Sequence, residues 1–133
     1  NKKKVKMEKT IAQELSITKL PFTITNDNGD IIYRERENGK WYREEYSKPE
    51  KPNYHECSEK GVIMDNRAIL TKLINRFNKK PKTIAQRLGV KSFPFKIYSD
   101  NGDLVYHENS SGLWFINVYN SDNKLVKQKS AYY

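Results

Sequence analysis

The side chains best suited to acid–base or metal chemistry are few in this sequence of 133 residues. His55, Glu56 and Cys57 place three metal-ligand types side by side, and the second histidine, His107, lies far along the chain. In a strand, His55 and Cys57 would share one face. A zinc site needs three or four converging ligands, however, and no CxxC or HxxxH pair supplies the others. The sequence therefore predicts neither a metal site nor a cofactor.

Two glutamates, Glu35 and Glu108, could be imagined as a pair of catalytic carboxylates. Each occupies the equivalent position of a repeated hairpin pattern, which favours a structural role in pairing with neighbouring strands. The sequence contains no phosphate-binding glycine loop, no GxSxG motif and no Cys-His constellation. We expect no catalytic residues, and the protein is predicted not to be an enzyme.

Composition indicates a folded, basic chain. Apolar residues make up 36% of it, charged residues 31% and aromatic residues 12%, which is too aromatic for a disordered segment. The 25 basic and 16 acidic residues give a net charge of +9. No apolar run approaches the roughly 20 residues that cross a bilayer, so no membrane partner is expected. Because Cys57 is the only cysteine, no internal disulfide can form, and a cytoplasmic location is predicted.

An internal repeat organises the sequence. Shifting it by 73 positions aligns residues 9–46 with residues 82–119 without a gap, and 18 of the 38 aligned positions are identical. Each copy begins with a threonine that can cap a short helix, Thr10 or Thr83. A proline, Pro21 or Pro94, then precedes alternating apolar and polar residues that indicate strands. An Asn-Gly pair, with Gly29 in the first copy, predicts a tight hairpin turn.

These patterns predict an α+β fold made by tandem duplication of one unit. The unit is expected to contain a short helix and a three-stranded antiparallel meander, and a basic amphipathic helix is expected to join the two copies. The predicted domains are residues 1–64, which include an extra degenerate hairpin, the connecting helix at 65–80, and residues 81–133. A repeat of Asp-Asn-x-Leu-Val at Asp122–Val126 predicts one more strand near the C-terminus.

A shorter pattern, Tyr-x-Glu followed by glycine, occurs three times. It begins at Tyr33, Tyr54 and Tyr106. Stretches such as DNGDLVYHENSSGLWFINVY and YHECSEKGVIMDNR resemble the Tyr- and Gly-rich hairpin repeats, similar to YD and MORN repeats, of small phage-type proteins of unassigned function. The resemblance covers about residues 21–67 and 93–127. It implies a non-catalytic interaction protein, encoded by a phage and acting in the host cytoplasm.

Net charge is concentrated in one region. Between residues 66 and 99 there are nine basic residues and no acidic one, whereas the rest of the chain balances at sixteen against sixteen. Within it, the apolar residues of 69–77 recur at helical spacing, with Asp65 as the predicted N-cap and Pro81 as the stop. The predicted binding residues for nucleic acid or a partner protein are Arg67, Lys72, Arg76, Lys79, Lys80, Lys82, Arg87 and Lys91.

Three interpretations of this basic region stay open: a solvated helix face, a nucleic-acid contact, or a contact with an acidic protein surface. The run Lys2–Lys6 has the same ambiguity, between a solvated tail and a nuclear address or phosphate-binding arm. A helix-turn-helix is not expected, because Ser92–Phe95 indicates entry to a strand where a recognition helix should begin.

Aromatic residues repeat with the unit and have two interpretations. Trp41 and Trp114, with the repeated tyrosines, could stack on single-stranded bases, but such residues more often form the core of a sheet. Leu113–Val118 is almost wholly apolar and must be covered on both faces, by the other unit, a partner or a second copy in a homodimer. The predicted apolar interface consists of Leu113, Trp114, Phe115, Ile116 and Trp41.

The leading functional hypothesis is a small basic protein that binds nucleic acid with low sequence specificity. The alternative is a phage-type inhibitor or adaptor that docks on an acidic or nucleic-acid-binding host protein, in an anti-defence or host-takeover role. The two hypotheses use the same residues and differ in salt dependence and in the choice of partner.

Overall fold

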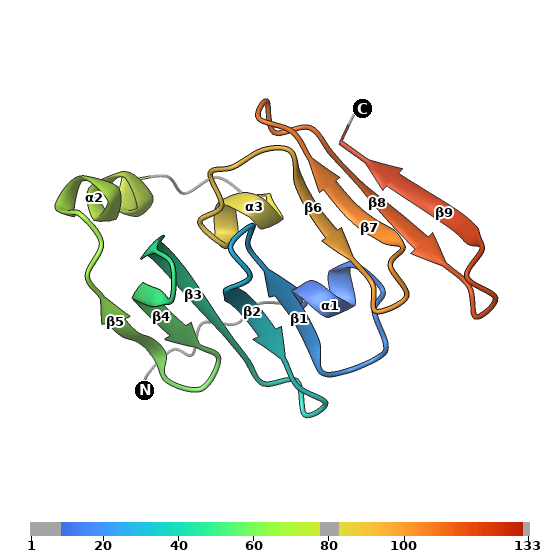
Figure 1. The fold of residues 1–133 in the computed structure, drawn as a ribbon, viewed down its shortest axis with the longest axis horizontal. Helices are drawn as coiled ribbons and strands as arrows, with labels where there is room; N and C mark the ends of the chain where they lie inside the picture. The colour runs from blue at the N-terminus through green and yellow to red at the C-terminus, as the bar shows by residue number, and fades with distance from the viewer. Residues whose placement is uncertain (1–8, 78–82, 132–133) are drawn as a thin grey trace. The chain divides into compact units, whose positions relative to one another are not determined.

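The computed structural model describes residues 9–77 and 83–131, which form two compact units (Figure 1). The first unit consists of residues 20–77. The second combines residues 9–19 with residues 83–131, so the first helical segment groups with the second copy of the repeat. None of the helices in these ranges is long and apolar enough to cross a bilayer.

The first unit is built on one antiparallel sheet of five strands in chain order, followed by a helix. Its elements are β1 (Phe22–Thr25), β2 (Ile31–Glu35), β3 (Trp41–Lys48), β4 (Lys51–Cys57), β5 (Gly61–Asp65) and α2 (Ile69–Phe77). Figure 1 shows this meander in the blue-to-green part of the ribbon, with α2 after the end of β5. Because each strand pairs only with its neighbours in the chain, β1 and β5 are the two edges of the sheet.

The second unit contains two short helices and a four-stranded antiparallel sheet. Its elements are α1 (Ile11–Glu14), α3 (Ile84–Arg87), β6 (Phe95–Tyr98), β7 (Leu104–Glu108), β8 (Trp114–Tyr119) and β9 (Leu125–Ser130). Both helices begin with a capping box, in which Thr10 or Thr83 exchanges hydrogen bonds with the glutamine three residues later. The predicted strand after Asp122 is confirmed as β9.

The predicted α+β fold class is wrong. The structure is mostly β, with sheets of five and four strands and only about 14% helix, and it is not a duplicated helix-plus-three-strand meander. The third strand of each sheet would leave a row of unpaired backbone groups on its outer side, and further strands satisfy them. In the first sheet β4 pairs with β3, with Glu44 opposite His55, and in the second β9 pairs with β8.

Two local predictions also need correction. The Asn-Gly turn forms at the predicted place, but only the glycine, Gly29, has a positive φ, of 84°. The chain closes instead by a bond from the Asn26 amide to the Asp30 carbonyl, across a longer loop with a register shift in β1. Asp65 does not cap α2, because it ends β5 and accepts hydrogen bonds from Arg67.

A ladder of three aromatic rings crosses the first three strands of each sheet. In the first sheet Phe22 meets Tyr33 edge to face at 6.4 Å between ring centroids, and Tyr33 stacks on Trp41 at 5.9 Å. The second sheet repeats the arrangement with Phe95, Tyr106 and Trp114. Tyr33 and Tyr106 are fully buried, so the prediction that these repeated tyrosines form a core is confirmed.

Candidate functional site

The Tyr-x-Glu pattern forms the same side-chain hydrogen bond in all three places. The hydroxyl groups of Tyr33, Tyr54 and Tyr106 donate to the glutamate two residues later, at 2.8, 2.9 and 2.6 Å. Tyrosine and glutamate at positions i and i+2 of a strand share a face, which makes this contact possible. The motif thus links neighbours on one face of each hairpin.

Glu108 accepts hydrogen bonds from three groups of the second unit. It is 1% exposed, and besides Tyr106 it accepts hydrogen bonds from the Thr83 hydroxyl at 2.6 Å and the Ala85 amide at 3.2 Å. The Ala85 amide belongs to the first turn of α3, where backbone donors lack helical partners. Burial and the bond to Glu108 raise the pKa of Tyr106. The carboxylate therefore fastens α3 to the sheet of the second unit.

The histidines and Cys57 do not converge. His55 stacks on Tyr42 and has its Nδ1 3.0 Å from a Glu44 carboxylate oxygen, whereas His107 stacks on Phe115. No group of three or more histidine, cysteine, aspartate or glutamate side chains with metal-site geometry occurs within residues 9–77 and 83–131.

The eight predicted binding cations have different surroundings. Lys72 is half-buried, and Arg76 and Lys91 are exposed. Arg87 is bound to Glu14 by two hydrogen bonds of 2.7 and 2.8 Å. Outside the described residues lie Lys79, Lys80 and Lys82, together with the predicted helix stop Pro81 and the run Lys2–Lys6.

Arg67 is held in a charged network on the first sheet. It donates to both carboxylate oxygens of Asp65 at 2.9 Å and to Glu45 at 3.2 Å, and its guanidinium carbon lies 3.9 Å from the centroid of the Tyr54 ring. The bonds from Arg67 hold the pKa of the Asp65 carboxyl below its usual value. Arg67 is therefore already neutralised by partners of its own unit.

Arg43 completes this network. It donates to Glu56 at 2.8 Å and to Glu45 at 2.7 Å, and lies 4.5 Å from the Tyr54 ring centroid. Burial alone would lower the pKa of Arg43, but the bond to Glu45 and the charge of Glu56 raise it. Burial also raises the pKa of Tyr54 to about 12, against the lowering influence of Arg43.

Helix α2 exposes its apolar side. None of its residues is buried, and its large apolar side chains are between 41% and 78% exposed. These side chains are Ile69, Leu70, Leu73, Ile74 and Phe77. The preceding edge strand, β5, also exposes Val62 and Ile63, each at 55%. The end of the first unit therefore combines uncovered apolar side chains with the cations Lys72 and Arg76.

The described units carry little of the net charge. Residues 20–77 contain ten basic and ten acidic residues, and residues 9–19 with 83–131 contain eight and five. The remaining six units of net positive charge belong to residues 1–8 and 78–82. The sequence predicts one basic footprint, whereas in the described residues Arg67 pairs with Asp65 and Glu45, and Arg87 pairs with Glu14.

The predicted apolar interface is only partly buried. β8 pairs with β7 on one side and β9 on the other. Ile116 is buried, and the other members of the stretch in the second unit, Leu113, Trp114 and Phe115, are half-buried. Trp41 lies in the aromatic ladder of the first sheet and is 9% exposed.

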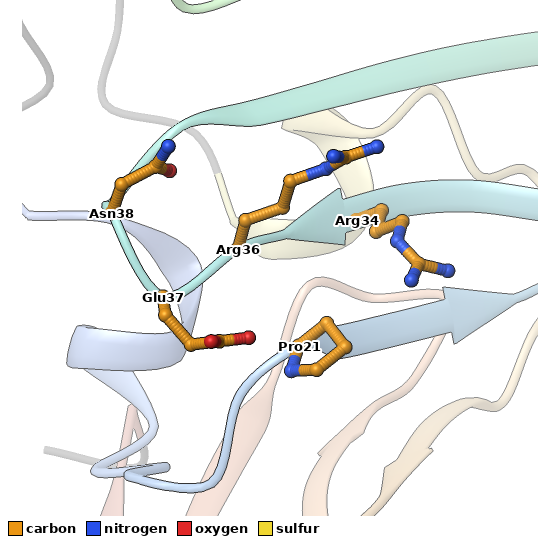
Figure 2. A pocket seen from close by; sticks show the side chains of 5 residues that line it. All are labelled: Pro21, Arg34, Arg36, Glu37 and Asn38. Carbon is orange, nitrogen blue, oxygen red and sulfur yellow. The ribbon is translucent and has the colours of Figure 1, made fainter.

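A hollow of about 390 Å³ lies at the end of β2 and was not predicted. It is lined by Pro21, Arg34, Arg36, Glu37 and Asn38 (Figure 2). Figure 2 shows Arg34 and Glu37 reaching toward Pro21 from different directions, whereas the Arg36 side chain extends away from Pro21. The sequence does contain a difference that marks this place. At the positions equivalent to Arg34 and Arg36, the second copy of the repeat has His107 and Asn109, so the two arginines are specific to the first copy.

Comparison with known proteins adds no functional assignment. No protein-family model matches the chain, and no curated protein matches its sequence.

Proposed function

We propose that this chain is a non-enzymatic binding protein that docks α2 into an apolar groove with an acidic rim on a partner protein. The observation that carries the proposal is the exposure of every large apolar side chain of α2. Leu70, Leu73, Ile74 and Phe77 follow the i, i+3, i+4, i+7 spacing by which helices occupy grooves. Burying one such side chain fully is worth about 1.5–3 kcal/mol, so a groove that covered several would gain substantial affinity.

Charge favours an acidic partner over a second copy of the chain. α2 contains Lys72 and Arg76 and no acidic residue. On a helical projection these two cations flank the apolar side next to Ile69. Two copies of α2 face to face would bring like charges together, whereas carboxylates on the rim of a groove would pair with them.

The test uses calcium-loaded calmodulin as a purified protein whose helix-binding groove has this chemistry. Fluorescence anisotropy of the labelled full chain should report binding that weakens at least tenfold in the Leu73→Ala, Phe77→Ala variant. The matched control, Thr71→Ala with Asn75→Ala, changes the opposite side of α2 and should bind like the wild type. Both variants should unfold at the wild-type temperature.

Two other outcomes would reject the proposal. A large drop in the unfolding temperature of the Leu73→Ala, Phe77→Ala variant would mean that the chain itself covers this side of α2. Concentration-dependent dimerisation that this variant abolishes, measured by light scattering after size-exclusion chromatography, would assign α2 to a homodimer.

Nucleic-acid binding of low specificity is the second candidate, favoured by the six units of net positive charge in residues 1–8 and 78–82. It predicts binding to random single- or double-stranded DNA or RNA that falls steeply with salt. The variant with Lys72, Arg76, Lys79 and Lys80 changed to alanine should lose this binding. Absence of binding at low salt would reject the second candidate without affecting the first.

A further inference from the structure

We propose that the hollow at the end of β2 binds a phosphate monoester carried on a hydroxyl-bearing group. The site belongs to the first unit, and its residues do not include α2, so it goes beyond the docking proposed above. It is lined by Pro21, Arg34, Arg36, Glu37 and Asn38.

Arg34 provides the strongest sign of a ligand. Its Nε lies buried and has no hydrogen-bond partner within the described residues. A guanidinium stays charged at any pH a protein meets, and a buried donor without an acceptor costs free energy. Arg87 also has an unpaired Nε, but its two Nη atoms are bound to Glu14. An oxyanion would reach Nε only after the Arg34 side chain turns toward the hollow, where Nε and Nη together present the side-on pair of donors typical of arginine.

The turn after β2 holds the other polar groups in place. The Arg36 amide donates to the Lys40 carbonyl and the Gly39 amide to the Arg36 carbonyl, both at 2.9 Å. The side-chain carbonyl of Asn38 accepts from the Lys40 amide at 2.9 Å, which leaves its NH₂ group as a donor. The site therefore offers two guanidinium groups and an amide donor on a hydrogen-bonded turn.

Phosphate suits this set of groups better than carboxylate. Arg34 and Arg36 together exceed the single negative charge of Glu37, so a dianionic phosphate monoester gains more from them than a monoanion does. The Glu37 carboxylate can only accept hydrogen bonds when ionised, and a hydroxyl of the ligand would supply the donor. A volume of about 390 Å³ also exceeds what a bare phosphate needs.

The second copy of the repeat supplies a natural comparison. It retains Pro94, but its other equivalent positions hold His107, Asn109, Ser110 and Ser111. Neither guanidinium nor carboxylate is present there. The same strand and turn therefore occur once with the proposed donors and once without them. The residues of the second copy can be placed in the first copy to make a variant that lacks the donors.

The experiment titrates the full chain with adenosine 5′-monophosphate at pH 8, followed by isothermal calorimetry and by the NMR signal of the Arg34 Nε–H. The wild type should bind, with a shift of that signal. Arg34→His with Arg36→Asn, which installs the second copy's residue types, should weaken binding roughly tenfold to a hundredfold. Glu37→Gln should weaken adenosine monophosphate binding while leaving that of inorganic phosphate equal or tighter.

Oligonucleotides distinguish a free small molecule from the end of a nucleic-acid strand. A preference for a 5′-phosphorylated strand over the mononucleotide would assign the monoester to a strand end, and the reverse would assign it to a small molecule. The proposal is overturned if the mononucleotide binds wild type and the Arg34→His, Arg36→Asn variant equally, or if 10 mM of it leaves the Arg34 signal unmoved. Equal binding of 5′-hydroxyl strands would overturn it too.

Discussion

In the first sheet the third strand carries Arg43 and Glu45, whereas the equivalent positions of the second sheet hold Ile116 and Val118. The first pair belongs to a charged network with Tyr54, Glu56 and Arg67. The second pair lies in a strand between β7 and β9, where Ile116 is buried. The aromatic ladder and the Tyr-Glu bond are common to both sheets. The comparison indicates that these shared contacts specify the hairpins, and that the third strand can change its chemistry.

The largest expected effect comes from breaking the shared contact. Glu108→Ala would leave the Tyr106 and Thr83 hydroxyls and the Ala85 amide without their buried acceptor. We expect a loss of about 3–5 kcal/mol in the free energy of unfolding, because each unsatisfied buried donor costs about 1–3 kcal/mol. Urea denaturation measures this, with the exposed Asp122→Ala as control, expected within about 0.5 kcal/mol of wild type. A loss below about 1 kcal/mol would show that the bond does not stabilise the fold.

A second effect is expected when the third strand of the first sheet is given residues of the third strand of the second sheet. Arg43→Ile gives β3 the residue of the second sheet and leaves Glu45 and Glu56 short of a partner, which should cost about 2–3 kcal/mol. Adding Glu45→Val, the residue type of Val118, should recover at least about 1 kcal/mol. A double-mutant cycle in urea measures the coupling. Purely additive losses would contradict the network.

Part of this architecture follows from the sequence, because the repeat is strong. The 73-residue shift identifies the equivalent strands, the capped helices at Thr10 and Thr83, and the Tyr-x-Glu pattern shared by Tyr33 and Tyr106. Local signals of this kind come from capping and alternation, which act within a few residues. The hydrogen bond that unites Tyr106 with Glu108 is likewise local.

The other features of the fold and of the site depend on pairing between segments that are distant in the sequence. The sequence predicts an extra hairpin within residues 1–64, but that β4 and β5 extend the first sheet, and that Arg67 also reaches Glu45, 22 residues away, cannot be derived from spacing alone. The periodicity of residues 69–77 predicts a helix with an apolar side, and the structure leaves that side exposed. Periodicity shows that an apolar side exists, without showing what covers it.

Alkaline titration probes a tyrosine that the second sheet lacks. Burial raises the pKa of Tyr54 to about 12, while an unfolded tyrosine titrates near 10. Because the folded value is the higher one, the stabilisation is complete below about pH 10 and is lost as the pH rises toward 12. The difference in absorbance at 295 nm between wild type and Tyr54→Phe should have its midpoint near pH 12. In urea that midpoint should fall to about 10. A midpoint near 10 in the native protein would contradict the raised pKa of Tyr54.

The smallest effect concerns a pair at equivalent positions of the two copies. Glu14 and Arg87 are 73 residues apart, the repeat distance, and form two hydrogen bonds in the second unit. Each side chain is 29% exposed, so a double-mutant cycle should give a coupling of only about 0.5–1 kcal/mol. If both copies had the same residue here, like charges would face each other. Glu14→Arg should therefore destabilise the fold, and Glu14→Arg with Arg87→Glu should restore it to within about 0.5 kcal/mol, since the swap keeps opposite charges at the contact. Failure of the swap would mean that the surroundings of α1 and α3 also distinguish the two copies, beyond the sign of this one charge.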